Sequence, residues 1–183
     1  MGTIYEGTST AAMRVLKITH YADSVFLRGK AQPVKPDPQD TVLRYFLQRL
    51  YQTVRHPRSA GIGIAAPQVG IPRQIIWVQR LDKPEEDYPF EAYLNPVIEA
   101  YSDSAAFNRE GCLSIPNRFE SVKRPCSIDI AYDTPAGEHR RETVTGFTAV
   151  IFQHEIDHLN GILYLDHLAE EQREQERRLK GGD

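Results

Sequence analysis

Long hydrophobic runs are missing from this sequence of 183 residues. The longest unbroken apolar runs are four residues, as in Ile75–Val78 and Ala149–Phe152, whereas a membrane-spanning helix needs about 20. An excess of basic residues is missing too, because 22 Lys and Arg stand against 25 Asp and Glu. Proteins that bind nucleic acid in general are usually basic. We therefore expect neither a membrane nor DNA as a partner.

Cysteine is also scarce. The two cysteines, Cys112 and Cys126, are too few for a disulfide framework, and their spacing is not that of a C-x-x-C redox pair. The opening residues MGTIYEGTST contain neither the basic segment nor the apolar segment of a secretory signal. We expect a cytosolic protein with reduced thiols, with an organelle as the alternative if a transit peptide has been removed.

The remaining composition is that of an ordinary folded protein, with 40% hydrophobic and 26% charged residues. A chain of this length suits one domain with a sizeable core. Residues 1–12 are small and polar, and we predict that they form a flexible N-terminal tail. Residues 13–183 are then predicted to form a single domain.

Hydrophobic spacing predicts the order of the elements. A helix that Asp40 can cap and that ends before Pro57 is predicted by apolar residues at helical spacing: Leu43, Phe46, Leu47, Leu50 and Val54. Segments rich in β-branched and aromatic residues predict strands at 74–81, 93–101, 121–133 and 138–147. A second helix is expected from Thr148 to Asn160-Gly161, and a charged third helix over 168–180. The predicted fold class is α+β, with antiparallel strands packed around the central helix 148–160, an N-terminal helix and a charged C-terminal helix.

The central helix contains the most informative local pattern, His154-Glu155-Ile156-Asp157-His158. Residues four apart lie on one face of a helix, so both imidazoles can reach one metal ion. Glu155 would then lie where it can take a proton from a water on that ion. Zinc lowers the pKa of such a water from 15.7 to about 7. The alternative is a helix with two surface histidines, since this five-residue pattern also occurs by chance.

A catalytic site of this type needs a third ligand. The metzincin pattern requires a histidine where this chain has Tyr164, and a thermolysin-like site requires a glutamate, for which Glu170 and Glu171 are candidates in a charged run. Cys112 is the other candidate, because a thiolate is a strong soft ligand. A lone cysteine is more often a small buried hydrophobic residue, which is the interpretation we adopt for Cys126.

Polar residues next to the motif have simpler interpretations. Asp157 lies on a different helix face from the histidines and is interpreted as solvated or as a residue that orients a ligand. Asp166 and His167 are assigned to the turn before the last helix.

A third stretch, Gly61–Gly70, has the sequence GIGIAAPQVG. Its small residues indicate backbone packed tightly against a neighbour. It is not a dinucleotide fingerprint, because Ala66 stands where that motif needs glycine. Gln68 is its one strongly polar side chain, and it either makes a hydrogen bond in a tight pocket or faces water in a turn.

Together, GIGIAAPQVG (61–70), EGCLS (110–114) and QHEIDHLNG (153–161) resemble the peptide deformylases. That family carries GIGLAAPQVG, EGCLS and QHExDHLxG in the same order. The resemblance covers about Arg14 to Leu168, and its opening, 15–34, looks like the family's N-terminal strand and turn. It implies a metal-dependent hydrolase of protein biosynthesis, which removes the formyl group from formyl-methionyl nascent polypeptides by attack of metal-bound hydroxide on the formyl carbon. The alternatives are an HExxH metalloendopeptidase and a zinc-stabilised binding module without activity.

The resemblance also implies a role for each site residue. Cys112, His154 and His158 would hold one divalent metal ion per chain, with Fe²⁺ expected natively and Ni²⁺, Co²⁺ or Zn²⁺ able to substitute. Glu155 would act as general base and then as acid. The oxyanion would be stabilised by two donors, the side chain of Gln68 and the backbone N–H of Leu113. The substrate would be bound by the following residues, some of which form the methionine pocket: Ile62, Gly63, Glu110, Gly111, Phe147, Val150 and Ile151.

Two points stay open at this stage. Many family members continue after Glu110–Pro116 with a glycine and then an arginine that touches the peptide, whereas this chain has Asn117-Arg118-Phe119. Arg118 would therefore take the role of that arginine one position early. The last helix would carry a basic stripe of Arg173, Arg177 and Lys180, which either faces water or docks the enzyme on the ribosome, where nascent chains emerge.

Overall fold

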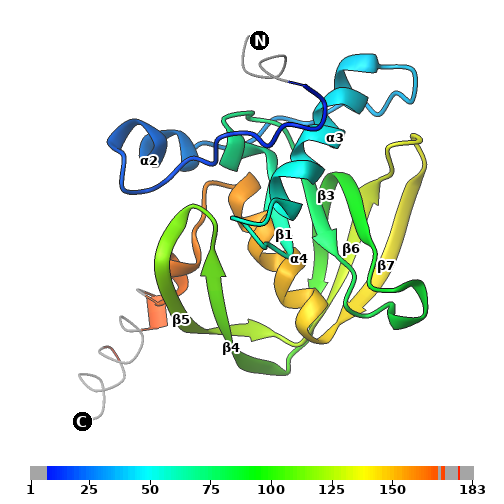
Figure 1. Ribbon diagram of the computed structural model, residues 1–183. Coiled ribbons are helices and arrows are strands. Elements are labelled where there is room, and N and C mark those ends of the chain that lie inside the picture. The colour runs from blue at the N-terminus through cyan, green and yellow to red at the C-terminus, as the bar shows by residue number, and fades with distance from the viewer. Residues whose placement is uncertain (1–7, 169, 172–176, 178–183) are drawn as a thin grey trace.

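The computed structural model describes residues 8–168, 170, 171 and 177. Helix α4 (Gly146–Leu159) lies at the centre, between a five-stranded sheet and a two-stranded hairpin (Figure 1). This arrangement confirms the predicted α+β fold with antiparallel strands around a central helix. No helix among the described residues combines the length and the apolar character needed to cross a membrane.

The larger sheet has the strand order β1-β2-β3-β6-β7, and each neighbouring pair is antiparallel. Its strands are β1 (Gly63–Ala65), β2 (Ile75–Gln79), β3 (Phe90–Tyr101), β6 (Ser127–Asp133) and β7 (His139–Thr145). The hairpin consists of β4 (Ala105–Cys112) and β5 (Ile115–Pro125), which pair only with each other among the described strands. Two short 3₁₀ helices are η1 (Ala66–Val69) and η2 (Pro84–Glu86).

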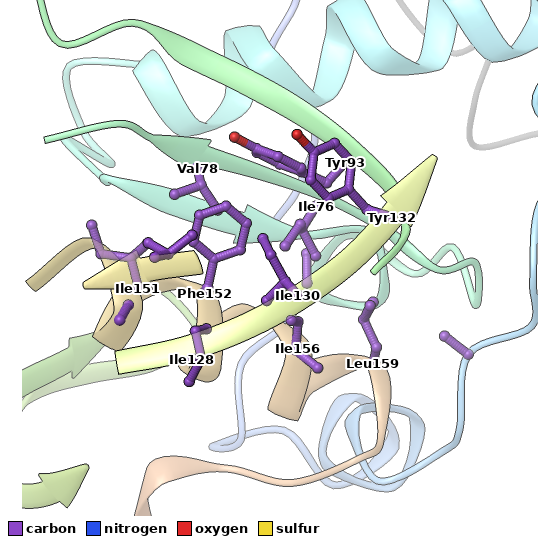
Figure 2. Close-up of a cluster of buried hydrophobic side chains, with 14 residues drawn as sticks. Ile76, Val78, Tyr93, Ile128, Ile130, Tyr132, Ile151, Phe152, Ile156 and Leu159 are labelled. Carbon is purple, nitrogen blue, oxygen red and sulfur yellow. The ribbon is translucent and has the colours of Figure 1, made fainter. Parts of the chain in front are cut away.

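The rotation of α4 about its axis is set by its apolar face. Phe152, Ile156 and Leu159 follow one another at helical spacing and are buried against the sheet (Figure 2). The sheet side of this cluster is formed by Ile76, Val78, Tyr93, Ile128 and Ile130. Full burial of one such side chain contributes about 1.5–3 kcal/mol. Because the sheet takes this face, the opposite face of α4, with its two histidines, turns toward the hairpin.

Helix α3 (Thr41–Arg55) confirms the prediction made from its spacing. The carboxylate of Asp40 accepts hydrogen bonds from the backbone N–H groups of Val42 and Leu43, which caps the helix as expected. Its apolar residues pack with Ile64 and Ile75 of the sheet in a second buried cluster. This packing holds the segment that leads into β1.

The strand predictions needed three corrections. The expected strand 121–133 is two strands, because the chain leaves the hairpin and joins the larger sheet at Cys126. Strand β4 was not predicted, since its sequence AAFNREGC contains no β-branched residue. Strand β1 was also not predicted, because the sequence of Gly61–Gly70 indicated only closely packed backbone.

The two ends of the described chain also differ from expectation. The segment 15–34 contains helix α2 (Tyr21–Leu27), where the resemblance implied a strand and a turn. Asp23 stabilises this helix region by pairing with the side chain of Arg14 and the backbone N–H of Lys17. At the other end, residues 164–168 are already helical, so Asp166 and His167 lie in a helix and not in a turn. Asp166 accepts a hydrogen bond from the backbone N–H of Leu163, which accounts for the early start.

Candidate metal centre

Three potential metal ligands meet where the hairpin crosses α4. Cys112 ends β4, and its Sγ atom lies 3.2 Å from Nε2 of His158. The ligand atoms of Cys112, His154 and His158 all lie within 4.8 Å of one another. Both histidines are buried and the cysteine is half-buried. One thiolate and two imidazoles suit a divalent ion of the iron, cobalt, nickel and zinc group, so the donor set fits a metal.

The surroundings of Cys112 favour its thiolate. Burial alone would raise the pKa of this thiol, but the neighbouring His158 and His154 lower it to well below its ordinary value. The backbone N–H of Ser114 and the side-chain nitrogen of Gln68 also point at the sulfur, at 3.4 Å and 3.5 Å. A thiolate is the form that binds metal ions.

The residues at the third-ligand positions of metzincins and thermolysin-like enzymes are not part of this group. Tyr164 is fully buried, and its ring stacks on that of His154 with 6.0 Å between the ring centroids. Within the described residues, the Cys112–His154–His158 group is the one cluster of potential ligands, and it includes neither Glu170 nor Glu171. A metzincin-like or thermolysin-like ligand set is therefore absent from the described part of the chain.

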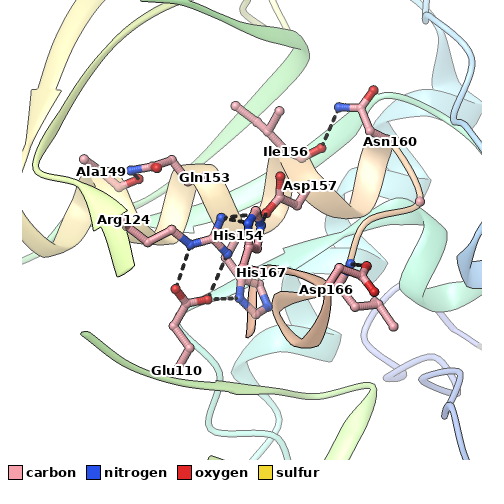
Figure 3. A network of polar contacts seen from close by, with 12 residues as sticks. Glu110, Arg124, Ala149, Gln153, His154, Ile156, Asp157, Asn160, Asp166 and His167 are labelled. Carbon is pink, nitrogen blue, oxygen red and sulfur yellow. Dashed lines mark hydrogen bonds and ion pairs between the residues drawn. The ribbon is translucent and has the colours of Figure 1, made fainter. Parts of the chain in front are cut away.

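A buried polar network orients His154 (Figure 3). The carboxylate of Glu110 lies 2.8 Å from Nδ1 of His154 and accepts two hydrogen bonds from Arg124, at 2.8 Å and 3.0 Å. Arg124 also donates to Asp157 at 2.6 Å, and His167 lies 2.7 Å from the same carboxylate oxygen. With Nδ1 engaged by Glu110, Nε2 of His154 is the nitrogen left to bind a metal.

This network assigns contacts that the sequence did not predict. Asp157 is an ion-pair partner of Arg124 and not a solvated carboxylate. Glu110 lines the cavity, as expected of a substrate-binding residue, but both of its oxygens face Arg124 and His154. Burial would raise the pKa of Glu110, yet hydrogen bonds from His154 and Arg124 lower it to about 2. Arg124 itself was not predicted. It lies two residues after the buried Val122 in β5, so both side chains are on the inner face of the hairpin.

Glu155 is a buried carboxylate beside His154 and His158. Its Oε2 atom has no hydrogen-bond partner among the described residues. Burial raises the pKa of Glu155 to about 7. A side chain at Gly63 would leave no room for this carboxylate, because a Cβ atom there would lie 2.5 Å from Oε1 of Glu155. A carboxyl group with a pKa near neutrality is suited to proton transfer.

Gln68 is also buried and does not face water. Its Oε1 atom accepts a hydrogen bond from the backbone N–H of Ala65, at 2.9 Å. This bond directs the Nε2 group toward Ser114 Oγ, at 3.2 Å, and toward Cys112. Of the two interpretations of Gln68, the structure therefore favours a hydrogen-bond donor in a tight pocket.

A cavity of about 540 Å³ opens beside these residues, a size typical of sites for small ligands. It is lined by every site residue predicted from the sequence except His158, whose Nε2 atom lies 3.2 Å from Sγ of Cys112. The other lining residues, which were not predicted as site residues, are Ser59, Ala60, Gly61, Arg109 and Phe119. Arg118 does not line the cavity and pairs with Glu120 at 2.7 Å.

Helix α4 with its HExxH sequence, a facing cysteine and a cavity define a class of protein, the metal-dependent hydrolases. A comparison with family models narrows this class, because the polypeptide deformylase model matches residues 15–174. The chain belongs to the polypeptide deformylase family.

Individual relatives agree with this assignment. The peptide deformylase of Phenylobacterium zucineum (strain HLK1) is 36% identical over 165 residues, which cover 90% of this chain and 92% of the relative. The crystal structure of the peptide deformylase from Thermotoga maritima has a TM-score of 0.75 and 32% identity, and the match covers 86% of this chain and 97% of that one. A class I type b peptide deformylase from Acinetobacter baumannii, bound to Met-Ala-Ser, has a TM-score of 0.75 and 32% identity, with 86% and 99% of the two chains covered.

Peptide deformylases are enzymes that remove the N-formyl group from nascent peptides, and this chain is one of them. The predicted function, amide hydrolysis at the formyl group in protein biosynthesis, is confirmed at this level. The metalloendopeptidase and the zinc-stabilised binding module are not supported by any of these comparisons.

Proposed function

We propose that Cys112, His154 and His158 hold one divalent metal ion and that Glu155 transfers the protons during deformylation. The observation that carries this proposal is the buried carboxylate of Glu155, which lines the same cavity as Cys112 and His154 and has an upward-shifted pKa. A divalent ion, when bound, would supply Lewis acidity and make a water molecule acidic enough to react near pH 7.

The chain's own residues then divide the remaining tasks. Glu155 takes the proton of the attacking water and gives it to the leaving amine, which is the N-terminal nitrogen of methionine. Gln68 Nε2 and the backbone N–H of Leu113 donate hydrogen bonds to the oxygen of the formyl group as negative charge develops on it. Removal of one such donor typically costs about 10²–10³ in rate.

The proposed methionine pocket is the apolar part of the cavity. Ile62, Phe147, Val150 and Ile151 line it together, and the last three lie on α4 on the side of His154. Gly63 and Gly111 bring backbone close to the cavity, where it can hydrogen-bond an extended peptide. This division of the cavity predicts how a larger side chain would act.

Replacing Val150 by tryptophan should fill the methionine pocket. We expect KM for a formyl-methionyl peptide to rise about tenfold or more, while KM for the matching formyl-glycyl peptide changes little, because glycine places nothing in the pocket. Steady-state kinetics on the two peptides measure this, with the formyl-glycyl peptide as internal control for folding. An unchanged ratio of the two KM values would place the pocket elsewhere.

For the metal, we propose Fe²⁺ as the native ion, with Ni²⁺, Co²⁺ or Zn²⁺ able to replace it. Ferrous iron and a cysteine thiolate can both be oxidised, so the iron form should lose activity in air and in peroxide faster than the nickel form. The half-lives of the two reconstituted forms at equal metal content provide the test. Equal half-lives would count against an iron–thiolate centre.

We also propose that the enzyme works beside the ribosome in the bacterial cytoplasm, or in an organelle that makes formylated proteins. The basic stripe of the predicted last helix supports this idea through its charge, since ribosomal RNA offers phosphates to cations. Arg177 is described as helical and exposed, whereas Arg173 and Lys180 lie outside the described residues. Deleting residues 169–183 should weaken co-sedimentation with ribosomes at low salt and leave activity on short peptides intact. Equal sedimentation of the truncated and the full-length protein would indicate that this segment only faces water.

The activity is best tested by offering three compounds to the metal-loaded protein. Formyl-Met-Ala-Ser should release formate, while acetyl-Met-Ala-Ser and casein should remain intact. The carbonyl carbon of a formyl group bears only a hydrogen atom, whereas that of an acetyl group bears a methyl group and that of a peptide bond a whole residue. The attacking oxygen can therefore approach the formyl carbon most closely. Cleavage of casein at a similar rate would favour the metalloendopeptidase instead.

A further inference from the structure

We propose that Arg109 selects substrates in which one of the two residues after formyl-methionine carries a carboxylate. This proposal deepens the deformylase function and rests on it. The charged residues that line the cavity are Arg109, Glu110, His154 and Glu155. The last three are 9% exposed or less, whereas Arg109 is exposed. Arg109 is thus the one charged side chain that the described cavity lining presents to solvent.

The alternation of β4 explains this position. Glu110 and Cys112 face α4, so Arg109 and Gly111 lie on the outer face of the hairpin. Gly111 pairs with Phe119 across the hairpin, and the Phe119 ring covers it so closely that a Cβ atom on Gly111 would lie 2.4 Å from the ring. The ring therefore lies at the cavity mouth, next to the metal ligand Cys112.

Phe119 also positions the charge of Arg109. The guanidinium carbon lies 5.1 Å from the centre of the Phe119 ring, a cation–π distance. Stacking of this kind occupies the flat face of a guanidinium and leaves its N–H edge free to donate. Among the described residues, Arg109 forms no ion pair. Its hydrogen-bonding edge is therefore available to a ligand at the mouth.

The other residues that line the cavity mouth do not neutralise the charge of Arg109. The lining residues contributed by the segment before β1 are Ser59, Ala60, Gly61 and Ile62, none of which is charged. Inside the cavity, the charge of Glu110 is already neutralised by Arg124. A substrate carboxylate could accept two parallel hydrogen bonds from Arg109, whereas a substrate lysine would be repelled.

The position of the selected residue follows from the geometry of the cavity. The proposed methionine pocket is formed mainly by α4, and Gly63 and Gly111, which also line the cavity, are where we place the backbone of the peptide that leaves the pocket. Arg109 lies two residues before Gly111 on the same face of β4, which is about 7 Å along the strand. One or two extended peptide residues span such a distance. The second and third residues of the substrate are therefore the ones that can reach Arg109.

The test uses peptides with amidated C-termini, so that the terminal carboxylate adds no charge. Asp, Asn or Lys is placed at the second or the third position of formyl-Met-X-Ala-amide and formyl-Met-Ala-X-amide. For the metal-loaded wild-type protein, we expect kcat/KM to be about three- to tenfold higher for Asp than for Lys at one of these positions, with Asn between them. The preference should shrink as salt is raised from 20 mM to 500 mM, because exposed charges are screened.

Two variants complete the test. Arg109→Glu should invert the preference for Asp over Lys, a ratio of two kcat/KM values that is measured on one protein and therefore does not depend on its overall activity. Lys123→Glu is the matched control, since Lys123 is exposed on the same hairpin, pairs with Phe107 and does not line this cavity. It should leave the preference unchanged. The same preference in wild type and Arg109→Glu, or an equal shift in both variants, would overturn the role of Arg109. Failure of the wild-type protein to release formate from any peptide would instead overturn the deformylase function on which the proposal rests.

Discussion

Glu155→Gln is expected to abolish most of the deformylation while the metal stays bound. Glutamine keeps the shape of the side chain and leaves Cys112, His154 and His158 untouched, but it cannot accept a proton. General acid–base catalysis typically contributes about 10²–10⁴ in rate, so kcat should fall by that factor. The oxyanion donors and the substrate cavity remain, so KM should change much less.

The measurement pairs metal content with single-turnover formate release. Glu86→Gln is the matched control, because it makes the same chemical change at an exposed glutamate in η2. The control should retain full activity and the same metal content as the wild type. A Glu155→Gln protein with a near-normal rate would contradict the role of Glu155, and a protein without metal would show that this side chain acts on metal binding instead.

Glu110→Ala should have the second largest effect, on both metal affinity and stability. The change removes the carboxylate that orients His154 and leaves the buried Arg124 with Asp157 as its one ion partner in the described part of the chain. Loss of one partner of a buried ion pair costs about 3–5 kcal/mol, which is a Tm lower by roughly 10 °C for a protein of this size. Loss of a side chain that orients a metal ligand typically weakens metal binding about 10–100-fold.

A double variant separates these two effects. Glu110→Leu with Arg124→Met removes both charges of the pair and fills the space with apolar atoms. Thermal unfolding should show part of the lost stability restored, because the unpaired charge of Arg124 is gone and Asp157 keeps its contact with His167 at 2.7 Å. Metal titration should show affinity still reduced, because His154 lacks its acceptor. Recovery of both properties would mean that Glu110 acts only through the stability of the fold.

Local patterns predicted the part of the site that lies on one element. His154, Glu155 and His158 were recognised because helical spacing alone places the two imidazoles on one face. The start of α3 was predicted in the same way, from Asp40 and the apolar residues that follow it. Such patterns depend on residues close in sequence, so they can be recognised without knowledge of the rest of the fold.

Features that depend on contacts between distant segments were not predictable from spacing. Cys112 remained one of several candidate ligands until the resemblance was considered, because nothing local places the end of β4 over α4. Arg124 meets Asp157 only through the packing of the hairpin on the helix. Arg109 was missed for the same reason, since β4 itself was not recognised as a strand and its alternation could not be used.

Anaerobic metal analysis coupled to the rate of formate release tests the central claim most directly. The protein is purified without oxygen, its metal is quantified, and formate release from formyl-Met-Ala-Ser is measured as the ion is removed by a chelator and restored. We predict one divalent ion per chain in the wild type and a rate proportional to the fraction of chains that hold it. Cys112→Ala should bind the ion far more weakly and lose activity in parallel. Formate release that persists after the ion is removed, or full metal content and activity in Cys112→Ala, would contradict the proposed centre.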